Sequence, residues 1–121
     1  MKKPIACIFG HKGGIGQVTK AAFVAQGYRI IPVHRAVLDL NNNNADTMID
    51  SMLTNGHPDV IVNAAGVFHN GWQQDHRETM NVNVGSNWSI LRHYMNPSNQ
   101  TKPTRIIMIG SSSHSGGRKL Y

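Results

Sequence analysis

Four glycines near the start of the chain, at positions 10, 13, 14 and 16, follow a short apolar run and precede a segment with helical spacing. Gly10, Gly14 and Gly16 are spaced as G-x-x-x-G-x-G. Residues without a Cβ let the backbone approach a phosphate, and the first turn of a helix adds free N–H groups and the positive end of its dipole. An isolated group of glycines is also typical of an ordinary tight turn. The spacing favours the binding of a nucleotide pyrophosphate.

The same stretch resembles the first turn of the short-chain dehydrogenase/reductase family, which usually reads T-G-x-x-x-G-I-G. Phe9 stands where that family usually has threonine, a departure that concerns the stability of the turn more than the cofactor. The resemblance implies that Gly10, Gly14, Ile15 and Gly16 bind the pyrophosphate of a dinucleotide cofactor.

A second resemblance competes for this stretch. Residues 12–16, K-G-G-I-G, are similar to the deviant P-loop of ParA/MinD-type ATPases. That loop continues with a lysine and a serine or threonine, which bind the β/γ-phosphates and Mg²⁺. Gln17 and Val18 occupy those two positions here. Dinucleotide binding is therefore favoured over ATP hydrolysis.

The residues after the second apolar segment bear on the choice of cofactor. An acidic residue at that place would bind the ribose 2′-OH of NAD, whereas Arg35 offers a guanidinium that can hold a 2′-phosphate with two hydrogen bonds. An arginine just after this strand accompanies NADP in the family, so the resemblance implies NADP rather than NAD, with His34 and Lys12 as helpers. Asp39 resembles the acidic residue that accepts a hydrogen bond from the adenine amino group. A solvated arginine and a turn aspartate are the alternatives.

The segment Asn63-Ala64-Ala65-Gly66 matches the family's N-A-G signature as N-A-A-G. Small residues there let the backbone pass beside the nucleoside, and the Asn63 side chain can tie neighbouring strands together. The tetrapeptide is common by itself, but here it follows the apolar run Val60–Val62, which gives it its specificity.

Two further residues resemble the family's catalytic groups. Asn83 resembles the helix asparagine that helps to hold a proton-relay water, with Asn81 as the competing assignment. Ser111 resembles the serine that hydrogen-bonds the substrate carbonyl, with Ser112 as the alternative. A polar helix residue and a serine-rich turn are the ordinary explanations.

The family also needs a tyrosine as general acid/base and a lysine four residues after it. Both would fall just beyond Tyr121. We therefore expect this chain to correspond to the N-terminal half of the family's domain and to lack the proton donor.

Four groups of candidate residues each follow a segment that the sequence predicts to be a strand: the glycine turn, residues 34–35, residues 63–66 and residues 110–111. The carboxyl ends of parallel strands are where such sheets bind ligands. Strands are expected over residues 5–9, 28–33, 37–40, 59–63 and 105–109, and helices over 17–26, 46–54 and 74–94. The alternation predicts an α/β, Rossmann-type, doubly wound parallel sheet of about five strands. We expect one dinucleotide-binding domain over residues 1–121, incomplete at its C-terminus.

The last predicted helix carries apolar residues at helical spacing, namely Met80, Val84, Trp88, Leu91 and Met95. Gly85 and the asparagines around it indicate that this helix is irregular. Similar proteins pair through this helix and the next one, which would lie beyond residue 121, so a homo-oligomer is expected by analogy with the family.

Composition narrows the class of protein. Of 121 residues, 40% are hydrophobic and 15% charged, which suits a globular domain. The single cysteine, Cys7, allows no disulfide within the chain and fits a cytoplasmic protein. No apolar run is long enough to span a membrane. The seven histidines show no ligand spacing, so no metal is predicted.

The formal net charge is +6, from 12 Lys and Arg against 6 Asp and Glu, but the basic residues are scattered along the chain. Attraction of an anionic cofactor or substrate explains this charge as well as nucleic acid does, and no nucleic-acid partner is predicted. The leading hypothesis is an NADP-dependent oxidoreductase that transfers a hydride to or from a small carbonyl or alcohol substrate held by Ser111. A dinucleotide-binding module without catalysis is the alternative, and a ParA-like ATPase ranks third.

Overall fold

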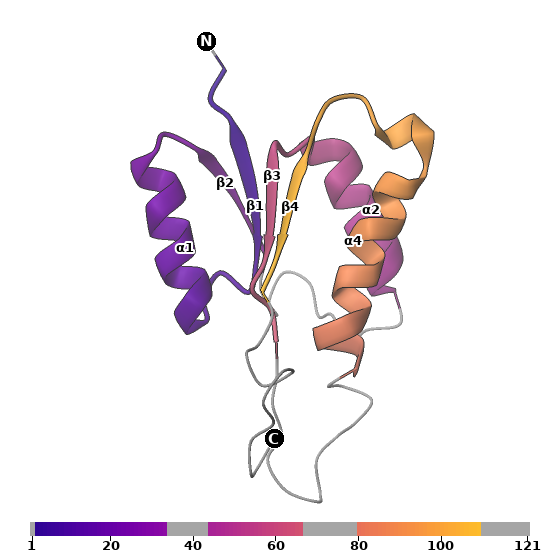
Figure 1. The fold of residues 1–121 in the computed structure, drawn as a ribbon, viewed down its shortest axis with the longest axis horizontal. Helices are drawn as coiled ribbons and strands as arrows, with labels where there is room; N and C mark the ends of the chain where they lie inside the picture. The colour runs from indigo at the N-terminus through magenta and orange to yellow at the C-terminus, as the bar shows by residue number, and fades with distance from the viewer. Residues whose placement is uncertain (1, 34–43, 67–79, 110–121) are drawn as a thin grey trace, which may run out of the picture.

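The computed structural model describes residues 2–33, 44–66 and 80–109, which form a parallel sheet flanked by helices (Figure 1). The four strands in these residues are β1 (Ile5–Phe9), β2 (Arg29–Val33), β3 (Val60–Asn63) and β4 (Arg105–Met108). Their order in the sheet is β2-β1-β3-β4, and every neighbouring pair is parallel. The chain thus moves from β1 to β2 on one side and then to β3 on the other, which places a topological switch point between β1 and β3. The expected Rossmann-type sheet is confirmed; the strand expected over 37–40 lies outside the described residues.

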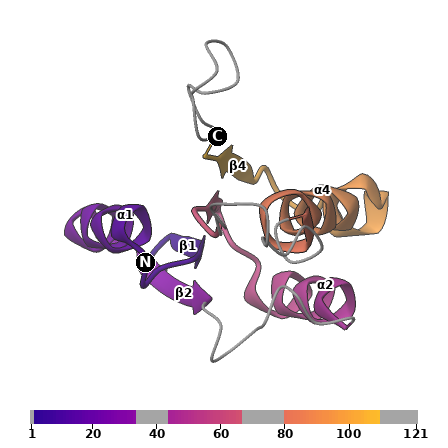
Figure 2. The same cartoon turned by 90° about the horizontal axis from the view of Figure 1, so that it is seen from below.

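Helices cover both faces of the sheet (Figure 2). Helix α1 (Gly14–Ala25) lies on one face, while α2 (Ala45–Gly56) and α4 (Ser86–Met95) lie on the other. The helix expected over 17–26 begins earlier, at Gly14, because Gly13 is its N-cap. In the part of the chain that the structure describes, no helix combines the length and apolarity needed to cross a membrane.

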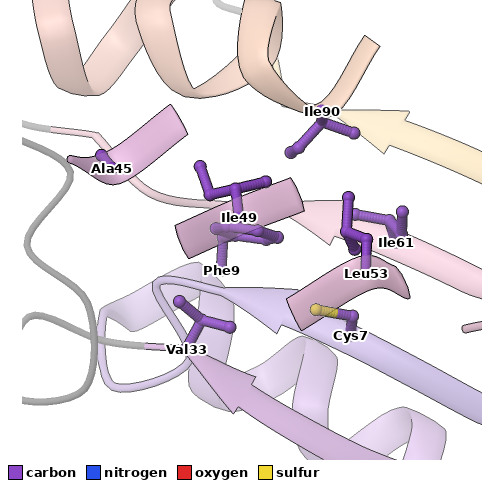
Figure 3. Close-up of a cluster of buried hydrophobic side chains, with 8 residues drawn as sticks. All are labelled: Cys7, Phe9, Val33, Ala45, Ile49, Leu53, Ile61 and Ile90. Atoms are coloured by element: carbon purple, nitrogen blue, oxygen red, sulfur yellow. The ribbon is translucent and has the colours of Figure 1, made fainter. Parts of the chain in front are cut away.

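The larger core cluster fills the space between the sheet and the α2/α4 layer (Figure 3). Its members are Cys7, Phe9, Val33, Ala45, Ile49, Leu53, Ile61 and Ile90. Strands β1 and β3 are buried along almost their whole length, since both of their faces are covered. Burial raises the pKa of the Cys7 thiol to about 12, so this residue acts as a small buried hydrophobe.

The irregularity expected in the last helix is a π-helical turn, η1 (Asn81–Gly85), which runs directly into α4. Beyond it the chain makes a short 3₁₀ turn, η2 (Pro97–Asn99), before β4. The residues of η1 and α4 that face the molecule are buried, namely Val82, Ser86, Ile90 and His93. The five apolar residues noted in the sequence occupy the opposite side and are 41–65% exposed. Helical spacing alone predicts two such stripes but not which of them faces the core.

A strained residue ends α2. His57 adopts the left-handed conformation, with φ 45° and ψ 55°, and its N–H donates to the Leu53 carbonyl at 3.1 Å. A residue with a Cβ loses roughly 1–2 kcal/mol in this region, where glycine is the usual helix-ending residue. We expect His57→Gly to raise the free energy of unfolding by about 0.5–1 kcal/mol in urea denaturation. His57→Ala keeps the Cβ and is the control; equal stabilisation by both variants would contradict the strain.

Candidate functional site

The glycine turn lies at the carboxyl end of β1, where the described strands end together (Figure 1). Gly10 has φ +76°, a conformation that favours glycine, and its N–H donates to the Val33 carbonyl at 2.8 Å. The Gly13 N–H then donates to the Gly10 carbonyl at 3.0 Å, and α1 starts at the next residue. Gly13 has no side chain to cap the helix, and none of residues 14–17 is acidic. The first N–H groups of α1 are therefore suited to bind an anion.

The glycines of this turn have different steric roles. A Cβ on Gly16 would lie 1.9 Å from the Gly10 carbonyl oxygen, so these two backbones meet where only glycine fits. A Cβ on Gly10 would lie 2.7 Å from the Ala65 nitrogen and 2.8 Å from the Ala64 oxygen. At Gly14, by contrast, a Cβ would meet nothing within 4 Å. Gly10 and Gly16 thus hold the turn together, and Gly14 leaves open space beside it.

The N-A-A-G segment packs directly against this turn. Asn63, at the end of β3, is 3% exposed and uses both ends of its amide. Its Nδ2 donates to Ser86 Oγ at 2.8 Å and to Asn87 Oδ1 at 2.6 Å. Its Oδ1 accepts the Ala65 N–H at 3.1 Å, which shapes the turn. We expected this side chain to tie neighbouring strands, but it ties β3 to α4, since its two partners there lie at the helix start.

The π-helical turn is stabilised by the same two partners of Asn63. The Ser86 hydroxyl donates to the Val82 carbonyl at 2.5 Å, and Asn87 Nδ2 donates to the Asn83 carbonyl at 3.3 Å. These side chains donate to carbonyls within a turn whose backbone hydrogen bonds join residues five apart, whereas those of an α-helix join residues four apart. Sequence reasoning did not single out Ser86 or Asn87; a serine and an asparagine just after the candidate Asn83 were the available signal.

Asn83 lies next to the N-A-A-G segment: its Oδ1 is 3.4 Å from the position that a Cβ on Gly66 would occupy. The structure therefore brings together three segments that are far apart in sequence, namely residues 10–16, 63–66 and 81–87. All three lie at the carboxyl edge of the sheet, beside the switch point between β1 and β3. This is the position at which open α/β sheets bind their ligands.

The remaining candidates divide into two groups. Lys12 and Ile15 are exposed on the glycine turn, where the Lys12 carbonyl accepts a hydrogen bond from Gln17 Nε2 at 2.8 Å. Gln17, which stands where a P-loop has its lysine, is thus engaged in shaping the turn. Outside the described residues lie His34, Arg35, Asp39 and Ser111. Among the residues that are described, no group of three His, Cys, Asp or Glu side chains could hold a metal ion.

Comparison with known proteins gives one family match and many similar structures. The model of the NAD dependent epimerase/dehydratase family matches residues 6–119. No curated protein matches the chain. A bulky-bulky ketone specific alcohol dehydrogenase from Comamonas testosteroni has a TM-score of 0.84 and 18% identity, covering 97% of this chain and 58% of its own.

Two cofactor complexes are also similar. ElxO with NADP bound has a TM-score of 0.77 and 16% identity, covering 97% of this chain and 59% of its own. A short chain dehydrogenase from Leptospira borgpetersenii with bound NAD+ has a TM-score of 0.74 and 18% identity, covering 92% and 52%. At these identities the likeness concerns the fold. The chain spans a little more than half the length of each of these proteins.

Proposed function

This chain belongs to the NAD dependent epimerase/dehydratase family, and from that premise we propose that it binds a dinucleotide and takes part in hydride transfer. One observation carries the proposal: the uncapped start of α1, the open space at Gly14 and the N-A-A-G segment adjoin one another at the carboxyl edge of the sheet. The pyrophosphate would lie on the first N–H groups of α1, with the Gly14 backbone beside it. The nucleoside would pass along Ala64 and Ala65.

The chemistry follows from the remaining candidates. A bound nicotinamide supplies or accepts the hydride. Ser111 would hydrogen-bond the carbonyl or hydroxyl oxygen of a small substrate, and Asn83 would help to hold a water that relays protons. A dinucleotide-binding module without catalysis is the alternative. Fluorescence titration with NADPH tests cofactor binding. A spectrophotometric screen of small ketones and alcohols separates the two when the protein assayed also carries the family's tyrosine and lysine: cofactor binding without turnover by that protein would favour the module.

NADP is the proposed cofactor, since Arg35 follows β2 where NAD-binding chains carry an acid. We expect Arg35→Ala to weaken NADPH binding by roughly tenfold to a hundredfold, because it removes a bidentate contact between arginine and phosphate. The binding of NADH, which has no 2′-phosphate, should change little. Dissociation constants from titration of both nucleotides provide the measurement. Lys20→Ala, which removes a positive charge from α1, is the control. Equal losses for NADPH and NADH would exclude a role with the 2′-phosphate.

We also propose that two copies of the chain pair through the exposed face of η1 and α4. Five large apolar residues follow one another on this face at spacings of four, four, three and four: Met80, Val84, Trp88, Leu91 and Met95. Such a row of 16 residues is about 24 Å long and suits the matching row of an antiparallel second copy. The pairing that the family resemblance implies uses this helix.

Trp88 lies near the middle of this row and is 56% exposed. We expect Trp88→Glu to convert the dimer to a monomer, because the carboxylate would have to be buried against apolar side chains. Size-exclusion chromatography with light scattering measures the mass. Val24→Glu is the matched control, since Val24 is 53% exposed on α1, across the sheet. A monomeric parent, or dissociation by both variants alike, would refute this interface.

A further inference from the structure

The end of the sheet opposite to the candidate dinucleotide site contains a cleft of about 730 Å³. Segments that begin all four strands contribute to it: Lys2 and Lys3 before β1, Arg29 at the start of β2, His57 and Asp59 before β3, and Lys102 before β4. This edge is at the top of Figure 1, whereas the glycine turn lies near the lower ends of the strands. A strand of five residues separates the two edges by about 16 Å. A small ligand at one edge therefore does not reach the other.

The charge of this cleft is strongly unbalanced. Four cations, Lys2, Lys3, Arg29 and Lys102, line it together with a single carboxylate, Asp59. Asp59 is already engaged: its Oδ2 accepts the Ile5 N–H at 2.8 Å and its Oδ1 accepts from Lys102 Nζ at 3.0 Å. The backbone N–H of Ile5, and then Lys102, lower the pKa of the Asp59 carboxyl, so it stays ionised and offsets one cation only.

The other three cations have no such partner in the part of the chain that the structure describes. Within residues 2–33, 44–66 and 80–109, no ion pair joins Lys2, Lys3 or Arg29 to a carboxylate. Their charges therefore add in one concave region. The positive electrostatic potential there, which attracts anions, is higher than it would be on a flat surface with the same charges. Arg29 supplies a planar fork of donors that matches a phosphate, and the two lysines supply point charges.

We propose that this cleft binds a small phosphorylated anion at the amino edge of the sheet, independently of the dinucleotide edge. Its volume is that of a small-molecule site. A nucleic acid backbone instead needs cations in an extended row. Lys12 and Lys20 lie on the glycine turn and on α1, away from this edge, and Arg92 of α4 pairs with Asp46 of α2 at 2.9 Å. Arg105 begins β4 at the same edge but is not among the residues that line the cleft, so the cations that converge belong to one cleft. The inference does not depend on the proposed oxidoreductase activity.

Titration of the ¹⁵N-labelled full chain with inorganic tripolyphosphate, followed by amide NMR shifts, tests the site directly. We expect saturable shifts at the amides of Ile5, Arg29, His57 and Lys102. Shifts confined to residues 13–16 would mean that the anion binds only at the glycine turn, and would overturn the proposal. Repeating the titration with saturating NADPH keeps the two edges distinguishable, because shifts at the amino edge should persist.

Two variants of equal charge sharpen the test. Arg29→Gln should weaken tripolyphosphate binding by about tenfold, the effect of losing one charge-assisted contact, whereas Lys20→Gln should change it less than twofold. Lys3→Gln should weaken it further when combined with Arg29→Gln. Equal effects of Arg29→Gln and Lys20→Gln would mean that binding depends only on the net charge of the protein, and would overturn the site. Tighter binding of a DNA duplex than of tripolyphosphate would overturn the choice of a small ligand.

Discussion

The Gly16→Ala variant is expected to lose roughly 3–5 kcal/mol of folding free energy, a large part of the stability of a domain this size. The added methyl carbon would lie 1.9 Å from the Gly10 carbonyl oxygen, 2.7 Å from the Gly10 carbonyl carbon and 2.8 Å from the His11 Cα. All three are backbone atoms, so no side-chain rotation relieves the overlap. Either α1 must move away from β1 or the turn must open. Urea denaturation followed by circular dichroism measures the loss.

Gly14→Ala is the matched control, two residues away in the same turn. A Cβ there meets nothing within 4 Å, and alanine favours a helix over glycine by about 0.8–1 kcal/mol. This variant should therefore be as stable as the parent or more so. If the pyrophosphate approaches the Gly14 backbone, the same methyl group should nevertheless weaken NADPH binding by about tenfold or more. Unchanged NADPH binding by Gly14→Ala would place the phosphates elsewhere, and a fully stable Gly16→Ala would contradict the packing of the turn.

The glycine pattern illustrates what sequence can and cannot predict here. The spacing of Gly10, Gly14 and Gly16 predicted a phosphate-binding turn between a strand and a helix, and the structure has a turn of that shape. The spacing could not predict that position 10 requires glycine because the backbone of Ala64 and Ala65 lies against it. That contact exists only because β3 lies beside β1. The assignment of separate roles to these glycines depends on strand order, which no local pattern contains.

The basic residues provide a second example. Along the chain they are scattered, and that spacing pointed to no basic cluster. In the folded sheet, the amino ends of neighbouring parallel strands meet, so Lys3, Arg29 and Lys102 line one cavity although they are far apart in sequence. Charge clustering across strands is a property of topology, and a count of charges or runs misses it.

Asn63 joins the end of β3, the N-A-A-G turn and the start of α4, and Asn63→Leu is expected to cost about 2–4 kcal/mol of folding free energy. Leucine has a similar size but cannot donate to Ser86 Oγ or Asn87 Oδ1, and it cannot accept the Ala65 N–H. The site is buried, so water does not easily replace these partners. The π-helical turn should loosen as well, because Ser86 and Asn87 are the side chains that satisfy its carbonyls. Thermal and urea denaturation would measure the cost.

The Asn87→Ala variant shows how much of the effect of Asn63→Leu comes from the hydrogen bond to Asn87 and how much comes from the other bonds of the Asn63 side chain. It removes one hydrogen bond to Asn63 and the 3.3 Å bond from Asn87 Nδ2 to the Asn83 carbonyl, and leaves the Asn63 bonds to Ser86 and Ala65 in place, so we expect it to cost only about 1–2 kcal/mol. A loss in Asn63→Leu no larger than in Asn87→Ala would mean that the turn is held by backbone contacts alone. A clear excess would mean that one buried amide fixes the N-A-A-G segment and Asn83 relative to each other. NADPH binding by the folded fraction of Asn63→Leu should then fall too, because the dinucleotide edge requires both segments in register.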